Sequence, residues 1–241
     1  MSFQILKEII DLVDFEICIC GGWAVYFIVN EYYQKQKDTN YIGSQDIDIC
    51  FSLKTMMGKT ELKETNLFKM LDILEKNDYK PSLLGYKKDI TFKNKEEKFT
   101  LYVDILVNSY PQSYQDIHPN SFFEVPLIEN IYNDKKYQMK MSKFSKYLFI
   151  PNREMMIAMK IISLPSRKKH HKMVKDLCDL YTLIWSADNS PDKIINKIFE
   201  MLGPTPFERL KEKIDKSLMK ECEYYLSEPE GSINTVISQI I

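Results

Sequence analysis

One stretch of the sequence, residues 17–51, constrains the fold more than any other. Short apolar runs bounded by glycine are typical of buried strands, and a longer apolar run is typical of a helix. The stretch contains, in order, an apolar run at 17–20, Gly21-Gly22, a helix-like segment at 23–29 and the sequence Asp46-Ile47-Asp48-Ile49. It therefore predicts a strand, a tight turn, a helix, a loop and a second strand.

Two carboxylates lie in the second predicted strand. Because successive side chains of a strand point to opposite sides, Asp46 and Asp48 are expected on one face, about 6.5–7 Å apart along the chain. Carboxylates held side by side repel one another unless a cation lies between them. Mg²⁺, or Mn²⁺ in its place, is the natural candidate because it binds carboxylate oxygens and shares its coordination shell with substrate phosphates.

The glycines before the helix have the character of a phosphate site. Gly21 and Gly22 let the backbone come close to a ligand, and a helix that opens at Trp23 directs its free N–H groups at an anion. Ser44, shortly before the aspartates, can add a hydroxyl to a phosphate. A carboxylate pair facing such a turn favours phosphoryl or nucleotidyl transfer. The alternatives are a purely structural turn and two solvent-facing acids on an edge strand.

A third carboxylate lies in a later strand, predicted at residues 99–107 and paired with a strand at 82–92 through a charged turn at 93–98. Four apolar residues fill one face of the later strand: Leu101, Val103, Ile105 and Val107. Asp104 falls on the other face, with Tyr102 and Leu106. Solubility explains a lone carboxylate at this position poorly.

These motifs carry a family resemblance. Gly21-Gly22-Trp23-Ala24-Val25 followed by Asp46-Ile47-Asp48 resembles the nucleotidyltransferase superfamily, and Gly-Gly-Trp-Ala looks like the antibiotic adenylyltransferases. Further along, Lys160, Arg167 and Lys175-Asp176-x-x-Asp179 resemble a segment of the nucleotidyltransferase toxins of abortive-infection and toxin-antitoxin systems. The alternative for the basic residues 167–172 is the solvent-exposed start of a helix with no binding role.

The resemblance implies an α+β fold, in which a nucleotidyltransferase-like mixed sheet flanked by helices precedes a C-terminal helical domain that closes over the nucleotide. It implies a catalytic and metal-binding role for Asp46, Asp48 and Asp104, with Asp104 helping to deprotonate the acceptor. The implied nucleotide-binding residues are Gly21, Gly22, Ser44, Lys160, Arg167 and Lys175. The implied reaction moves a nucleoside monophosphate from a nucleoside triphosphate such as ATP to a hydroxyl of RNA (a tRNA end), of a protein or of a small molecule. A toxin of this kind would have an antitoxin partner.

One departure from the resemblance favours a different class of protein. The antibiotic adenylyltransferases have a Thr-Arg pair and a His just ahead of the aspartates, after a shorter connection. This chain has Tyr41-Ile42-Gly43-Ser44-Gln45 instead, after a polar stretch at 30–44 that is too long for a simple turn. The alternative is therefore a catalytically inactive nucleotidyltransferase-fold protein with a binding or regulatory role.

The rest of the chain predicts two domains, at residues 1–150 and 151–241. The first has an N-terminal helix at 2–13, a covering helix at 60–77 and short strands within 121–149. The second domain is predicted to be helical, and its first helix is capped by Asn152 and ended by Pro165. Further helices are expected at 168–187 and between Ser190 and Gly203. Thr205-Pro206-Phe207-Glu208 is predicted to be a capping box for another helix, and a short helix follows Ser232.

Composition limits the partners and the compartment. The 33 basic and 34 acidic residues nearly balance, so bulk charge gives no case for nucleic-acid or membrane binding. Without an apolar run of about 20 residues or a secretory N-terminus, we expect a cytoplasmic protein without a membrane partner. Of the five cysteines, Cys18 and Cys20 lie in the first predicted strand, where small apolar thiols are a better interpretation than a metal or redox site.

Overall fold

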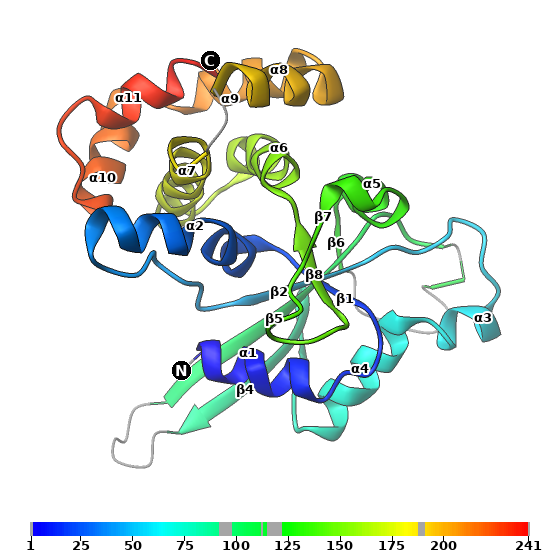
Figure 1. Cartoon of the computed structure of the whole chain (residues 1–241). Helices are drawn as coiled ribbons and strands as arrows, with labels where there is room; N and C mark the ends of the chain where they lie inside the picture. Colours follow the sequence, from blue (N-terminus) through cyan, green and yellow to red (C-terminus); the bar gives the residue numbers. More distant parts are fainter. Residues whose placement is uncertain (1, 92–97, 112, 115–121, 188–190, 241) are drawn as a thin grey trace. The chain divides into compact units, whose positions relative to one another are not determined.

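The computed structural model describes residues 2–91, 98–111, 113–114, 122–187 and 191–240 (Figure 1). The chain forms two compact units. The N-terminal unit comprises Met1–Tyr26 and Ile42–Pro151, and the C-terminal unit comprises Phe27–Tyr41 and Asn152–Ile241. The units divide close to residue 150, but the segment Phe27–Tyr41, from the first half of the sequence, groups with the C-terminal helices.

Within the described residues, the N-terminal unit is built on one mixed sheet of eight strands, in the order β3-β4-β5-β2-β1-β8-β7, with β6 paired to β5. The strands are β1 (Ile17–Ile19), β2 (Ile47–Phe51), β3 (Lys80–Ser82), β4 (Gly85–Thr91), β5 (Lys98–Val107), β6 (Phe123–Glu124), β7 (Gln138–Lys140) and β8 (Leu148–Pro151). β2 runs parallel to β5 and antiparallel to β1. The predicted mixed sheet flanked by helices and followed by C-terminal helices is thus confirmed.

The alternation of side chains on β5 is as the sequence predicts. Leu101, Val103, Ile105 and Val107 have no exposed surface, whereas Tyr102 is exposed and Asp104 and Leu106 are half-buried. One face of the strand therefore belongs to the core, and the face that carries Asp104 is the more open one. The turn predicted at 93–98 falls almost entirely in residues 92–97, outside the described part of the chain.

The helix α2 (Gly21–Lys37) differs from the prediction at both ends. It begins at Gly21 rather than Trp23, because Gly21 adopts a φ of +60° that bends the chain from β1 directly into the helix. It also continues through residues 30–37, which were predicted as part of a long loop. Those residues are polar but include good helix formers such as Glu31, Gln34 and Lys35, so polarity there marks an exposed helix surface rather than a loop.

The remaining helices of the N-terminal unit are α1 (Ser2–Asp11), α3 (Lys59–Lys63), α4 (Asn66–Lys76), α5 (Leu127–Asn133) and the 3₁₀ turn η1 (Lys135–Tyr137). α1 confirms the predicted N-terminal helix. The single helix predicted at 60–77 is wrong, since Thr65 interrupts it: its side chain accepts a hydrogen bond from the Phe68 N–H and caps α4. The sequence pattern also missed α5, which lies between the short strands.

The chain from Arg153 onward forms helices joined by loops. These are α6 (Arg153–Ser163), the 3₁₀ turn η2 (Leu164–Ser166), α7 (His170–Trp185), α8 (Pro191–Leu202), α9 (Thr205–Lys213), α10 (Lys216–Leu226) and α11 (Ser232–Ile237). The predicted cap of α6 is confirmed, because Asn152 Oδ1 accepts from the Met155 N–H at 2.9 Å. The capping box at Thr205 is wrong: α9 starts at Thr205 itself, and Pro204 precedes it without a side-chain cap. α10 was missed.

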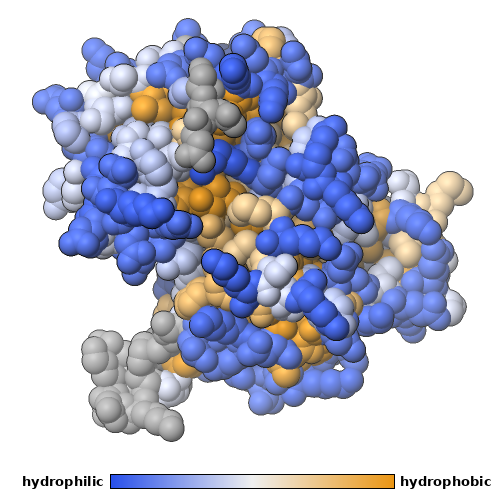
Figure 2. All heavy atoms as spheres, in the orientation of Figure 1, coloured by the Kyte–Doolittle hydropathy of each residue, from blue (hydrophilic) through white to orange (hydrophobic). Residues whose placement is uncertain are grey.

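The surface seen in Figure 2 is mostly hydrophilic, with hydrophobic residues showing between the polar side chains. This is the distribution expected when apolar side chains fill the interior of each unit. Among the described residues, the structure contains no helix of the length and apolarity needed to cross a membrane.

Candidate functional site

Asp48 and Asp104 lie side by side in the sheet of the N-terminal unit. They are direct partners in the parallel pairing of β2 with β5. Neighbouring strands are about 4.8 Å apart, and partner residues of a parallel pair point to the same face. Both side chains are half-buried. The structure therefore joins two acids that are far apart in the sequence on the open face of β5.

Asp46 occupies a different local position from the one predicted. β2 begins at Ile47, and Asp46 lies in the bend just before it, half-buried. Strand alternation therefore sets the direction of Asp48 but not that of Asp46. Asp46 remains two residues from Asp48, at the entrance of the same strand.

Gly21 packs directly against Asp48. A Cβ atom placed on Gly21 would lie 1.9 Å from Asp48 Oδ2, and the Cys20 N–H donates to the Asp48 carbonyl at 2.9 Å. Only glycine fits this position, because the residue needs both a positive φ and room for the carboxylate. The start of α2, with Gly22 as its second residue, lies beside an anionic side chain, so the positive end of the helix dipole stabilises that carboxylate.

Gly85 is a site residue that the sequence patterns did not single out. It is the partner of Asp104 in the antiparallel pairing of β4 with β5, and a Cβ there would lie 2.2 Å from the Val103 carbonyl oxygen. The position beside Asp104 on β4 therefore carries no side chain. A row of four residues crosses the sheet from β4 to the end of β1: Gly85, Asp104, Asp48 and Cys20.

The segment that contains Ser44 contacts the N-terminus of the chain and the Trp23 ring. Ser2 Oγ donates to the Ser44 carbonyl at 2.8 Å, and Gly43 packs so closely on the Trp23 ring that an added Cβ would lie 2.9 Å from it. Trp23 is only 4% exposed, and its ring lies 5.3 Å from that of Phe3. Trp23 is thus a core residue, and the chain segment that leads into Asp46 packs against it.

The predicted basic residues belong to a buried ion network in the C-terminal unit. Lys160 Nζ contacts both Asp176 and Asp179, the latter at 2.7 Å, and its side chain is 7% exposed. Arg167 Nε lies 2.6 Å from Asp176, and Lys175 pairs with Asp179. The side chains of Arg167 and Lys175 are 34% and 24% exposed, so they are the members that reach solvent.

The network holds Asp176 and Lys160 in their charged forms. Burial by itself raises the pKa of Asp176, but Lys160 and Arg167 outweigh it and hold that pKa below its ordinary value. Burial by itself lowers the pKa of Lys160, but the carboxylates of Asp176 and Asp179 outweigh it and raise that pKa. Tyr41 adds a hydrogen bond, since its hydroxyl donates to Asp179 Oδ1 at 2.8 Å. The closure of the helical domain over a nucleotide stays a prediction.

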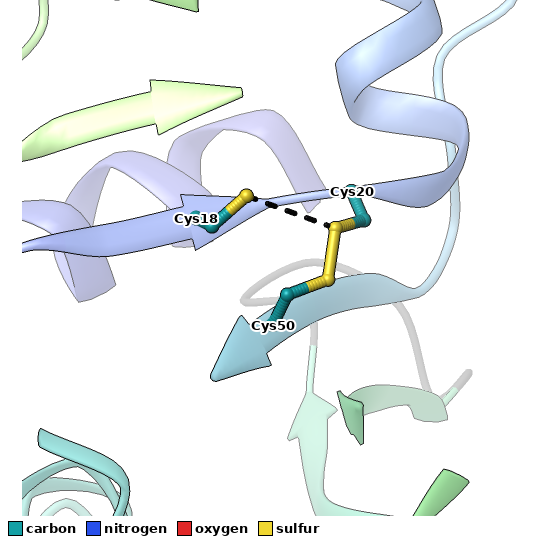
Figure 3. A group of neighbouring side chains, drawn as sticks. All are labelled: Cys18, Cys20 and Cys50. Carbon is teal, nitrogen blue, oxygen red and sulfur yellow. Dashed lines mark hydrogen bonds between the residues drawn. A yellow bond between two sulfur atoms is a disulfide. The ribbon is translucent and has the colours of Figure 1, made fainter. Parts of the chain in front are cut away.

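A cluster of cysteines lies next to the acids. Cys20 and Cys50 form a disulfide, and Cys18 Sγ lies 3.9 Å from Cys20 Sγ (Figure 3). The prediction of plain apolar thiols is therefore wrong for Cys20, while Cys18 is a free, buried thiol as expected. The sequence could not show the disulfide, because Cys50 is 30 residues from Cys20. The antiparallel pairing of β1 with β2, in which Cys18 lies opposite Cys50, brings the three cysteines together.

Comparison with known proteins adds one similarity. No protein-family model matches the chain, and no curated protein matches it in sequence. Among solved structures, the chain is similar to an antigenic nucleotidyltransferase-like protein from Paracoccidioides brasiliensis, with 15% identity and a TM-score of 0.40, over 89% of this chain and 92% of that one. Because both the identity and the TM-score are low, function has to rest on the residues of the site.

Proposed function

We propose that the N-terminal unit is a metal-dependent nucleotidyltransferase that moves a nucleoside monophosphate from a nucleoside triphosphate to a hydroxyl acceptor. The observation that carries the proposal is the alignment of Asp48 with Asp104 on adjacent parallel strands, beside the glycine start of a helix. In this assignment Asp46, Asp48 and Asp104 hold Mg²⁺ or Mn²⁺. Gly21, Gly22 and Ser44 bind phosphate.

The donor set suits Mg²⁺. Two carboxylates in register on adjacent strands repel one another, and a hard divalent cation relieves that repulsion. Gly85 keeps the neighbouring position on β4 free of a side chain, so the acids are not covered from that strand. The half-burial of both acids favours a bound ion over two separately hydrated carboxylates.

The protein's own groups have distinct tasks in this proposal. The glycine start of α2 lets backbone N–H groups come close to a phosphate. Asp104, on the open face of β5, accepts the proton of the attacking hydroxyl. A bound Mg²⁺ would supply polarisation of the α-phosphate and charge compensation for the leaving pyrophosphate.

Within the C-terminal unit, the proposal assigns anion binding to Arg167 and Lys175. Arg167 and Lys175 are the partly exposed members of the ion network. A guanidinium or ammonium group placed in this way can bind a triphosphate. Lys160 holds both buried carboxylates, and its assigned role is to keep Asp176 and Asp179 in place for the other two. A toxin-like role with an RNA or protein acceptor and an antitoxin partner is part of the same proposal.

The test is transfer of label from α-³²P-labelled nucleoside triphosphates to cellular RNA, protein or small molecules in the presence of Mg²⁺. We expect Asp48→Asn and Asp104→Asn to lower the rate by at least about 100-fold, because several kcal/mol of charge stabilisation are lost and about 1.4 kcal/mol corresponds to tenfold. Asp89→Asn is the matched control, since Asp89 is an exposed carboxylate of β4 that accepts from Thr100 at 2.7 Å. It should retain full activity.

The alternative, an inactive binding module, is favoured by the lead-in at 41–45, which has neither arginine nor histidine. It predicts that nucleoside triphosphate with Mg²⁺ raises the melting temperature of the wild type, but not of Asp48→Asn, without any transfer of label. If neither ligand stabilisation nor transfer occurs in the wild type, both functions are wrong.

A further inference from the structure

Three buried sulfur atoms gather on one face of β1 and β2. The ligand atoms of Cys18, Cys20 and Cys50 all lie within 4.8 Å of one another, and the three side chains have no exposed surface. Figure 3 shows Cys18 on β1, Cys20 just after this strand and Cys50 on β2, with the sulfur of Cys18 beside the Cys20–Cys50 disulfide. The disulfide uses two of these residues and does not account for the third.

We propose that, in the reduced chain, Cys18, Cys20 and Cys50 form a three-thiolate site for a soft d¹⁰ cation of the Zn²⁺, Cd²⁺ or Cu⁺ class. The site lies next to the carboxylates, takes a different class of cation and does not depend on nucleotidyl transfer. Thiolates select such cations, while carboxylate oxygens select hard ions such as Mg²⁺.

The spacing of the sulfur atoms fits this class of ligand. Two sulfurs bound to one zinc-like ion through bonds of about 2.3 Å lie about 3.8–4.0 Å apart in tetrahedral or trigonal geometry. Cys18 Sγ and Cys20 Sγ are 3.9 Å apart. The Cα atoms of Cys20 and Cys50 are 6.5 Å apart, so their sulfurs can separate to a similar distance after reduction by side-chain rotation.

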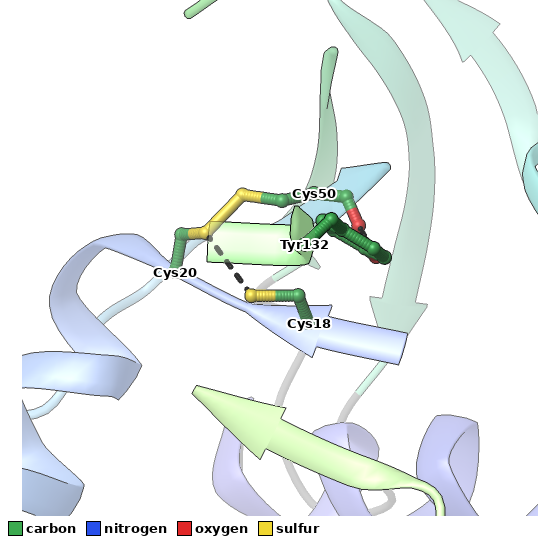
Figure 4. The surroundings of a disulfide bond; sticks show 4 residues. All are labelled: Cys18, Cys20, Cys50 and Tyr132. Atoms are coloured by element: carbon green, nitrogen blue, oxygen red, sulfur yellow. Dashed lines mark hydrogen bonds between the residues drawn. A yellow bond between two sulfur atoms is a disulfide. The ribbon is translucent and has the colours of Figure 1, made fainter. Parts of the chain in front are cut away.

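The surroundings hold the three ligands in place. Cys18 and Cys50 are partners in the antiparallel ladder, and Cys20 precedes the start of α2, where the helix dipole stabilises a thiolate. Tyr132 lies beside the cluster, and its hydroxyl donates to the Cys50 carbonyl at 2.7 Å (Figure 4). The ligands therefore come from a fixed backbone rather than from loops.

The chemistry links the site to the redox state. A dithiol reductant supplies two electrons and two protons, the Cys20–Cys50 bond breaks, and two thiols form while the reductant becomes a disulfide. The cation then displaces three protons, breaking three S–H bonds and forming three metal–sulfur bonds. The oxidised chain offers only the Cys18 thiol of this cluster, so it cannot bind the ion in this way.

The test uses Cd²⁺ on the full chain, reduced with a dithiol and then freed of reductant under anaerobic conditions. We expect one equivalent of Cd²⁺ per chain and an ultraviolet thiolate-to-cadmium band. We also expect Cys18, Cys20 and Cys50 to be alkylated more slowly with Cd²⁺ than in the reduced chain without Cd²⁺, mapped by mass spectrometry. Cys18→Ser and Cys50→Ser should weaken binding at least about 100-fold, since loss of a supporting residue alone costs about 10–100-fold.

Cys222→Ser is the matched control. Cys222 and Cys178 form a second buried pair, with sulfurs 3.1 Å apart, in the C-terminal unit. This variant should bind Cd²⁺ like the wild type. The proposal is wrong if Cys18→Ser binds as tightly as the wild type, if Cd²⁺ slows alkylation at Cys178 and Cys222 instead of at Cys18, Cys20 and Cys50, or if the folded chain resists reduction. Because the alkylation map is read on the wild type, misfolding of a variant leaves the test decisive.

Discussion

Gly21 is the residue whose identity the structure restricts most sharply. It has a φ of +60°, and its Cα lies against the Asp48 carboxylate, where a Cβ would meet Oδ2 at 1.9 Å. A left-handed conformation costs a non-glycine residue about 1–2 kcal/mol, and the contact adds to that cost. Gly21 thus allows both the bend from β1 into α2 and the close approach of the helix start to Asp48.

We expect Gly21→Ala to lower the free energy of unfolding by more than ~2 kcal/mol, measured by urea denaturation, because the backbone penalty and the clash combine. Gly203→Ala is the matched control. Gly203 has a similar φ of +68°, but an added Cβ there meets nothing within 4 Å. Equal losses in the two variants would contradict the contact with Asp48.

Some residues could be assigned a role from the sequence alone, and others could not. The alternation around Asp104 and the capping role of Asn152 depend on neighbours in the chain, and both are found as predicted. Gly85 and Cys50 matter through partners that lie far from them in the sequence, Asp104 and Cys20 respectively. No local pattern marks such partners, so the sequence did not reveal these two residues.

At the scale of elements, the ion network holds α6, η2 and α7 together. Lys160 is on α6, Arg167 follows η2, and Lys175, Asp176 and Asp179 are on α7. Truncating one partner of a buried ion pair leaves charge without compensation in a low-dielectric interior. The bonds of Lys160 to two carboxylates therefore make it the centre of this helix packing.

We expect Lys160→Met to lower the free energy of unfolding by ~3–5 kcal/mol, because Asp176 and Asp179 stay buried without their shared cation. Lys197→Met is the control. Lys197 on α8 lies 3.7 Å from Glu154, and its side chain is 67% exposed, so its removal should change stability by less than ~0.5 kcal/mol. A small effect at Lys160 would mean that Arg167 and Lys175 can take over its bonds.

The same network predicts a pH dependence. The folded pKa of Asp176 lies below its ordinary value, so its stabilising contribution is complete above about pH 4 and is lost as pH falls through the folded pKa. The stability difference between wild type and Asp176→Asn should therefore be largest near neutral pH and shrink in acid, measured by urea denaturation. A difference that stays constant from neutral to acidic pH would contradict the depressed pKa.

At the scale of the whole molecule, the two units are not two consecutive pieces of chain. Helix α2 starts beside the acids of the N-terminal unit, and its residues from Phe27 onward group with the C-terminal unit. There Tyr32 and Tyr33 pack edge-on against Trp185, with ring centroids 5.1 and 6.2 Å apart. Tyr41 closes the same segment through its hydrogen bond to Asp179.

We expect a fragment of residues 152–241 to lack cooperative unfolding, because it misses the aromatic packing on Trp185 and the Tyr41 bond to the buried Asp179. Circular dichroism with thermal melting measures this. Addition of a peptide spanning residues 21–41 should restore a cooperative transition, whereas the same peptide with Tyr33→Ser and Tyr41→Ser should not. A fragment that melts cooperatively alone would show that the segment is dispensable for this unit.

The sequence by itself determined the elements whose signals are local. These are the strand, glycine bend and helix at the start, the alternation on β5, and the cap of α6, because periodicity and capping act over a few residues. Only the tertiary structure decided which distant segments meet. The register that aligns Asp48 with Asp104, the Cys20–Cys50 bond and the division of α2 between two units depend on strand pairing and side-chain packing across long stretches of chain, which no single local pattern encodes.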